Sequence, residues 1–123
     1  MKIEVSNGEI IDKLTIIQIK LEHITDKAKL INLQKEYDEL LHASAAIISP
    51  GDPLCISLYG INSELWDIED RIRDLERKRD FGEEFISTAR SVYFKNDKRS
   101  EIKREINIKT GSGLIEEKSY EKY

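Results

Sequence analysis

Four carboxylates lie close together in the stretch NSELWDIEDRIRDLERKRDFG, residues 62–82: Glu64, Asp67, Glu69 and Asp70. Carboxylate oxygens are the ligands that hard cations such as Mg²⁺ prefer, and a bound magnesium ion can neutralise phosphate charge and orient an attacking water. The same spacing is also typical of the solvated face of an ordinary helix. The stretch therefore leaves two interpretations open: a metal site or the solvent-exposed face of a helix.

One helix cannot complete such a metal site. On a helix, residues three or four apart share a face, so Glu64 and Glu69 fall on opposite flanks of the apolar side, while the two aspartates point largely away from it. The site would therefore need acids from a neighbouring helix. The preceding predicted helix offers Glu36 and Glu39.

The pattern Glu36-x-x-Glu39 followed by Glu64-x-x-Asp67 resembles that of the all-α MazG-type nucleotide pyrophosphohydrolases. This resemblance implies a magnesium-dependent nucleoside triphosphate pyrophosphohydrolase in which these four acids hold the metal. The chain departs from the family pattern at Lys35, where the family has a further acid. Because 24 of the 123 residues are Asp or Glu, such spacings also arise by chance. An enzyme is therefore the alternative interpretation, not the leading one.

Basic residues gather in the second half of the chain. Residues 71–109 carry twelve Lys/Arg and eight Asp/Glu, whereas residues 1–70 carry six and thirteen. Arg99, Lys103 and Arg104 fall in the basic part, and an arginine that interrupts an apolar line can bind a carboxylate or a phosphate through its guanidinium. An anion-binding module is the third interpretation. Basic and aromatic residues do not interleave as in single-strand binders, so nucleic acid is not an expected partner.

Apolar spacing predicts the elements that carry these side chains: an all-α antiparallel bundle of about four helices with coiled-coil-like packing. The first helix follows a capping box, Ser6-x-x-Glu9, and the second follows Thr25 or Asp26. The apolar stripe of the first helix comprises Ile10, Leu14, Ile17, Leu21 and Ile24. Further isoleucines lie off this stripe, so this helix is apolar on more than one side and should be the most buried.

The third helix should run from about Pro53 to Asp80. Its apolar residues keep a seven-residue repeat over three heptads, which indicates long helices packed at a shallow angle. A fourth helix follows Gly82. Polar residues interrupt its apolar line at 95–99, where the helix either breaks or leaves the core, and residues 110–113 should end it.

Residues 1–123 are expected to form a single domain, because a chain of this length has too little interior to divide. Residues 2–5 are either a short strand or an extended N-terminal arm, and residues 110–123 form a C-terminal tail that either docks or is flexible. The chain has no long apolar segment, so we expect a soluble cytoplasmic protein without membrane contact. Cys55 is the single cysteine, which excludes an intrachain disulfide.

Trp66 lies well off the apolar stripe of the third helix, with Tyr59 one heptad before it and Arg73 one heptad after it. These three residue types concentrate at protein interfaces. The leading interpretation is therefore a non-enzymatic assembly or interaction module, most simply a homodimer, that buries this stripe and needs no cofactor. The alternative is that the first helix or the C-terminal tail covers the stripe within one chain.

Several motifs together resemble a bacterial family of unknown function. They are VSNGEIIDKLTI at 5–16, LWDIEDRIR at 65–73, Asn96-Asp97-x-Arg99, KREIN at 103–107 and EKSY at 117–120. The resemblance extends nearly end to end. It implies membership of that family, and it implies no activity, cofactor or partner.

Overall fold

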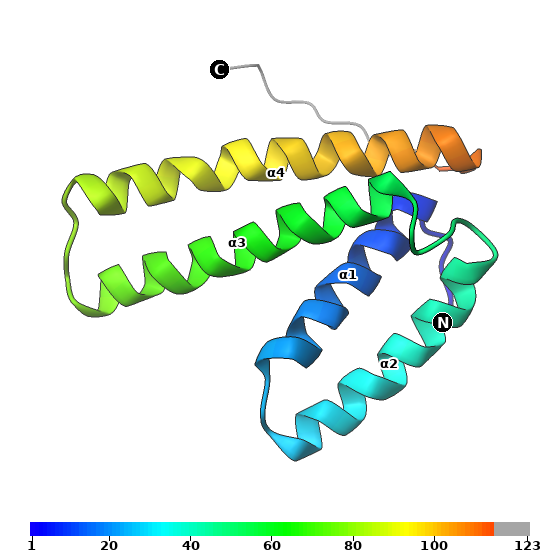
Figure 1. The fold of residues 1–123 in the computed structure, drawn as a ribbon, viewed down its shortest axis with the longest axis horizontal. Coiled ribbons are helices and arrows are strands. Elements are labelled where there is room, and N and C mark those ends of the chain that lie inside the picture. Colours follow the sequence, from blue (N-terminus) through cyan, green and yellow to red (C-terminus); the bar gives the residue numbers. More distant parts are fainter. Residues whose placement is uncertain (115–123) are drawn as a thin grey trace.

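The computed structural model describes residues 1–114, which contain four helices and no strand (Figure 1). The helices are α1 Asn7–His23, α2 Lys27–Ala45, α3 Pro53–Arg77 and α4 Glu83–Thr110. The predicted all-α class is confirmed. Residues 2–5 belong to no helix or strand, and the motif EKSY with most of the predicted tail lies outside the described residues.

The four helices form two antiparallel hairpins that meet at one end and diverge (Figure 1). The α3–α4 hairpin is the longer, and α1 packs against it while also pairing with α2. The backbone of α2 packs only against α1 in the described part of the chain. The bundle is therefore open on one side, and α1 is the element that joins the two hairpins.

Local capping residues set the helix ends. The Ser6 hydroxyl accepts from Glu9 N–H, and Asp26, not Thr25, caps α2 by accepting from Lys29 N–H. Asp52 caps α3 through Leu54 N–H. Each of these side chains satisfies a backbone donor that has no partner inside its helix. Gly111 ends α4 with a left-handed backbone at φ 65°, a conformation that glycine adopts without strain.

The burial of α1 differs from the predicted stripe. Only Ile17 of the predicted line is fully buried, whereas Ile11 and Ile19 are also buried, together with the small or polar residues Gly8, Asp12 and Thr15. The physical reason is that α1 contacts three helices, so no single stripe can contain its buried side. The expectation that this helix is the most buried agrees with the structure, since α2 has only Ser44 fully buried.

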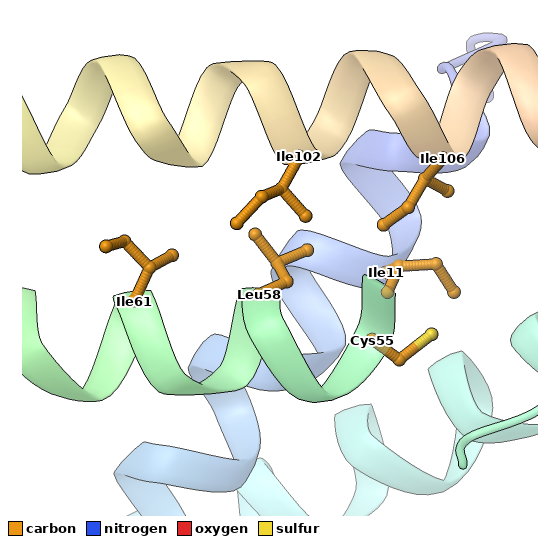
Figure 2. Packing of buried hydrophobic residues seen from close by; sticks show 6 residues of the cluster. All are labelled: Ile11, Cys55, Leu58, Ile61, Ile102 and Ile106. Atoms are coloured by element: carbon orange, nitrogen blue, oxygen red, sulfur yellow. The ribbon is translucent and has the colours of Figure 1, made fainter. Parts of the chain in front are cut away.

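The apolar core lies where α1 crosses the α3–α4 hairpin (Figure 2). Its buried members come from all three helices: Ile11, Cys55, Leu58, Ile61, Ile102 and Ile106. Burial of these side chains away from water is the main force that holds the two hairpins together. The core therefore fixes the position of every polar side chain that α1 directs towards α3 and α4.

Two long helices continue beyond this core. Residues 95–99 remain helical within α4, so the polar interruption is not a break in the helix. Beyond the core, residues 74–94 form the free end of the hairpin, here called the distal arm, which extends past α1 and α2 (Figure 1). Leu75 is the one buried residue of the distal arm.

Among the described helices, none is apolar over a length sufficient to cross a bilayer.

Candidate functional site

The N-terminal turn of α1 lies directly against α4 at Gly8. Gly8 N–H donates to the Asn107 side-chain oxygen at 2.6 Å. A Cβ atom on Gly8 would lie 2.5 Å from the backbone oxygen of Lys103, which is closer than atoms tolerate. Glycine is therefore required here by space, and the contact sets how closely α1 and α4 approach.

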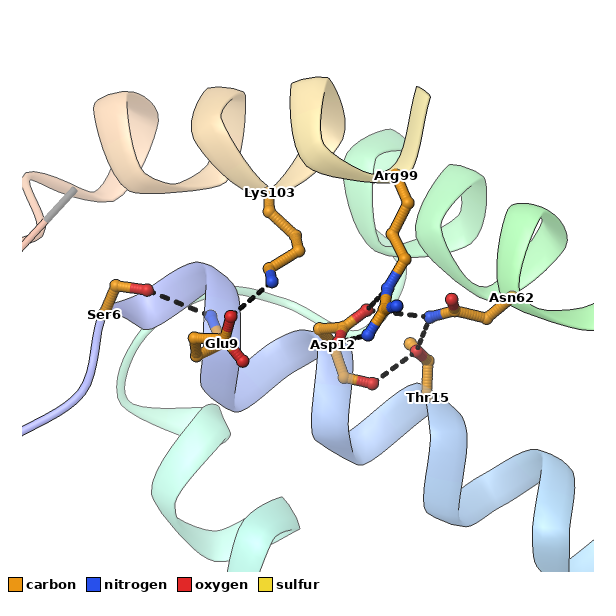
Figure 3. Close-up of polar contacts among 7 residues, drawn as sticks. All are labelled: Ser6, Glu9, Asp12, Thr15, Asn62, Arg99 and Lys103. Atoms are coloured by element: carbon orange, nitrogen blue, oxygen red, sulfur yellow. Dashed lines mark hydrogen bonds and ion pairs between the residues drawn. The ribbon is translucent and has the colours of Figure 1, made fainter. Parts of the chain in front are cut away.

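Asp12 is the centre of a buried polar network between α1, α3 and α4 (Figure 3). Its carboxylate is 3% exposed and accepts from Arg99 through both oxygens, with Nε to Oδ1 at 2.8 Å and Nη2 to Oδ2 at 2.5 Å. The Asn62 amide donates to Asp12 at 3.0 Å and to the Thr15 hydroxyl at 2.8 Å. Thr15 in turn donates to the Asp12 backbone oxygen at 2.8 Å.

One turn further along α4, Lys103 pairs with the Glu9 carboxylate (Figure 3). The predicted anion-binding residues are thus arranged unequally: Arg99 and Lys103 reach α1 carboxylates, whereas Arg104 is exposed. The sequence allowed Arg99 to bind either a carboxylate or a phosphate, and in the structure it binds the carboxylate of Asp12. Because its fork already holds Asp12 in two-point geometry, an external anion would have to displace a buried partner.

A cleft of about 470 Å³ opens where the two hairpins diverge. α1 contributes Ile16 and Ile19 to its wall, α3 contributes Trp66 and Arg73, and α4 contributes Arg99. Two of the four acids in residues 62–82, Glu69 and Asp70, also line the cleft. The cleft therefore combines an apolar wall with charged side chains of both signs.

The predicted interface stripe is divided by the last turn of α1. His23 stacks on Trp66 with ring centroids 4.8 Å apart, and the Tyr59 hydroxyl donates to the Glu22 carboxylate at 2.6 Å. Trp66 and Arg73 line the cleft between the hairpins, whereas Tyr59 lines a second, smaller cleft of about 220 Å³ between α1, α2 and α3. The indole N–H of Trp66 is buried and has no acceptor among the described residues.

The predicted metal ligands lie on two helices whose backbones do not touch. Glu36 pairs with Lys13 at 3.1 Å, and Glu64 pairs with Lys95 at 2.8 Å. Glu39 and Asp67 are exposed on α2 and α3. The described residues contain no group of three or more His, Cys, Asp or Glu side chains arranged to hold a metal ion. The structure does not bring these four acids together.

Tyr59, Cys55 and Asp52 are among the ionisable groups whose pKa values are shifted. The hydrogen bond to Glu22 raises the pKa of Tyr59 above its usual value. Burial raises the pKa of the Cys55 thiol. The contact with Lys109 lowers the pKa of Asp52, which links the start of α3 to the end of α4. None of these three groups lines the cleft that contains Trp66, whereas Tyr59 and Cys55 line the smaller cleft.

Sequence reasoning missed Asp12 and Asn62. Both are polar, and the periodicity of apolar residues places polar side chains on the solvent side by default. A signal was present, because Asp12 directly follows the buried Ile11 and Asn62 directly follows the buried Ile61. Two buried polar residues on neighbouring helices require partners, and Arg99 is the cation that reaches one of them.

The family motifs meet at this junction. Gly8, Glu9 and Asp12 belong to the first motif, and the residues of α4 that they contact, Arg99 and Lys103, belong to two others. No curated protein and no solved structure is detectably similar to the chain. All 123 residues match the family described as "Family of unknown function (DUF6165)". The chain therefore belongs to DUF6165, a family of unknown function.

Proposed function

We propose that this chain is a non-catalytic interaction module that forms a homodimer through the concave side between its two hairpins. The observation that carries the proposal is the cleft of about 470 Å³, which presents Trp66 and Arg73 at the point where the hairpins diverge. Trp and Arg are the side chains that contribute most to binding at interface centres. The hydrogen bond from Tyr59 to Glu22 holds the last turn of α1 against α3. This turn forms one edge of the proposed dimer surface.

The distal arm supports the same proposal. Only Leu75 is buried in residues 74–94, while Phe81 and Ile86 are 52% and 54% exposed. Large apolar side chains that remain exposed can contribute to a protein-binding surface. A second copy that covers the arm and the cleft would bury apolar area that one chain leaves in water.

The test is the mass of the purified protein by light scattering and sedimentation equilibrium, over about 1–100 µM, a range that brackets a micromolar dimer. We expect a dimer that Trp66→Ala and Arg73→Glu each weaken. Lys29→Glu is the matched control for Arg73→Glu, because Lys29 is exposed on α2 away from the cleft. A single monomer mass across the whole range would overturn the proposal.

A further inference from the structure

We infer that the two copies pair with their α3 helices antiparallel, so that the loop 78–82 of each copy lies in the cleft of the other and Arg79 faces the partner's Asp70. This inference rests on the proposed homodimer and specifies its geometry. It follows from the charges, the unpaired groups and the backbone of the distal arm.

The charges along the second half of α3 are self-complementary. Glu69 and Asp70 line the cleft, whereas Arg77, Lys78 and Arg79 follow two to three turns later at the other end of the same stretch. The seven helical steps from Asp70 to Arg77 span about 10 Å, and Lys78 and Arg79 follow in the turn that ends α3. When two such stretches run antiparallel about a two-fold axis, each acidic end meets the basic end of the other copy, and both contacts form at once.

Two of these charges have no partner within the described part of one chain. Glu69 pairs with Arg73 at 3.5 Å, and Lys78 pairs with Asp74 at 2.9 Å. Asp70 and Arg79 form no ion pair with any residue from 1 to 114, and both are exposed. The two-fold arrangement supplies each with the opposite charge, which is how complementary charges fix the register of an interface.

The backbone at Arg79 adds an independent observation. Arg79 N–H donates to Glu76 C=O at 3.0 Å, and Asp80 N–H donates to Leu75 C=O at 2.9 Å, which is the Schellman geometry that ends a helix. Arg79 occupies its left-handed position at φ 53°, where glycine is usual. Arginine adopts this conformation less readily than glycine, so the backbone alone does not favour an arginine at this position.

Phe81 completes the fit of loop and cleft. It lies two residues after Arg79, is 52% exposed, and contacts Phe85 edge-on with ring centroids 5.1 Å apart. The cleft offers it an apolar wall made of Ile16, Ile19 and Trp66. An aromatic side chain in such a recess flanked by charged groups matches the usual anatomy of an interface core and rim.

The decisive experiment measures the dimer dissociation constant of two charge reversals, separately and mixed. Asp70→Arg and Arg79→Asp should each raise it roughly tenfold to a hundredfold, because every dimer contains the contact twice. An equimolar mixture should return to nearly the original affinity, because in the mixed dimer both contacts again join opposite charges. Only a contact between two chains predicts this recovery. Glu39→Arg on α2 is the control and should change little.

Arg79→Gly tests the same contact with a substitution that favours folding. It should raise the thermal midpoint of the dilute monomer by roughly 4 °C, because it relieves the left-handed strain, while it weakens the dimer. A dimer that neither reversal weakens, or one that mixing does not restore, would overturn this geometry and leave the homodimer standing. A monomer at all concentrations would remove both.

Discussion

Gly8 and Tyr59 show at the scale of single residues how α1 is held on the longer hairpin. At the start of α1, Gly8 allows the backbone of α1 to lie close to that of α4. In the last turn of α1, Glu22 accepts a hydrogen bond from the Tyr59 hydroxyl of α3. The two contacts act at opposite ends of one 17-residue helix. Together with the core they determine the direction in which the second hairpin leaves the first.

Gly8→Ala should destabilise the protein by about 2 kcal/mol, because the added Cβ would overlap the backbone oxygen of Lys103 and force α1 away from α4. Gly60→Ala is the matched control. Gly60 lies within α3 with no atom within 4 Å of an added Cβ, so alanine there should stabilise the helix by about 1 kcal/mol. Urea denaturation of both variants measures the difference, and equal free energies of unfolding would contradict the role of Gly8.

The Tyr59 hydroxyl should ionise at a higher pH than an ordinary tyrosine, because its hydrogen bond to Glu22 favours the protonated form and raises its pKa. The bond therefore stabilises the fold below the ordinary tyrosine pKa of about 10 and is lost as the pH rises through the raised value. Difference absorbance titration of wild type against Tyr59→Phe isolates this group. Glu22→Gln should return its pKa towards the ordinary value, and an unchanged titration would refute the assignment.

At the scale of helices, the Asp12 network joins α1 to both members of the longer hairpin. Asp12 meets Arg99 from α4 and Asn62 from α3, and all three sit beside the apolar core. A buried charge is tolerated only when its partners are in place. The hydrogen bonds of the network form in only one axial position of α1 relative to α3 and α4. Apolar contacts alone would allow α1 to shift along its axis.

Asp12→Asn should cost about 3 kcal/mol of unfolding free energy, because it leaves the Arg99 guanidinium, whose side chain is 29% exposed, beside a neutral amide. Glu69→Gln removes a carboxylate from an exposed pair, Glu69 with Arg73, and should cost less than about 1 kcal/mol. Both variants should be unfolded in urea at one fixed protein concentration, since association would otherwise add to stability. A loss for Asp12→Asn no larger than that for Glu69→Gln would show that the network does not hold the hairpins.

At the scale of the whole molecule, the two hairpins diverge and leave the bundle open on one side (Figure 1). In the described part of the chain the backbone of α2 packs against α1 alone, and it is α1, through His23, that stacks on Trp66. The cleft is lined by residues of α1, α3 and α4. The distal arm is the free end of the α3–α4 hairpin (Figure 1). The net charge of −4 is small, so the proposed homodimer would depend on the arrangement of charges along residues 69–79 more than on their total.

The sequence by itself determined the all-α class and, to within a few residues, the limits of the helices. These features depend on local interactions: apolar spacing within a helix, side chains such as Ser6, Asp26 and Asp52 that accept from nearby N–H groups, and the left-handed Gly111. The end of α3 fell three residues before the predicted Asp80, because the Schellman turn at Arg79 closes the helix early.

Only the tertiary structure decided which polar residues are buried and how the hairpins are oriented. Asp12 and Arg99 are 87 residues apart in the chain, and Gly8 and Asn107 are 99 apart. Periodicity describes one helix at a time, so it assigned α1 a single buried stripe although three helices surround it. It could not place Trp66 and Tyr59 in different clefts, because their separation depends on where the last turn of α1 crosses α3. Contacts between distant segments arise from the packing of whole elements, and that packing is absent from any local pattern.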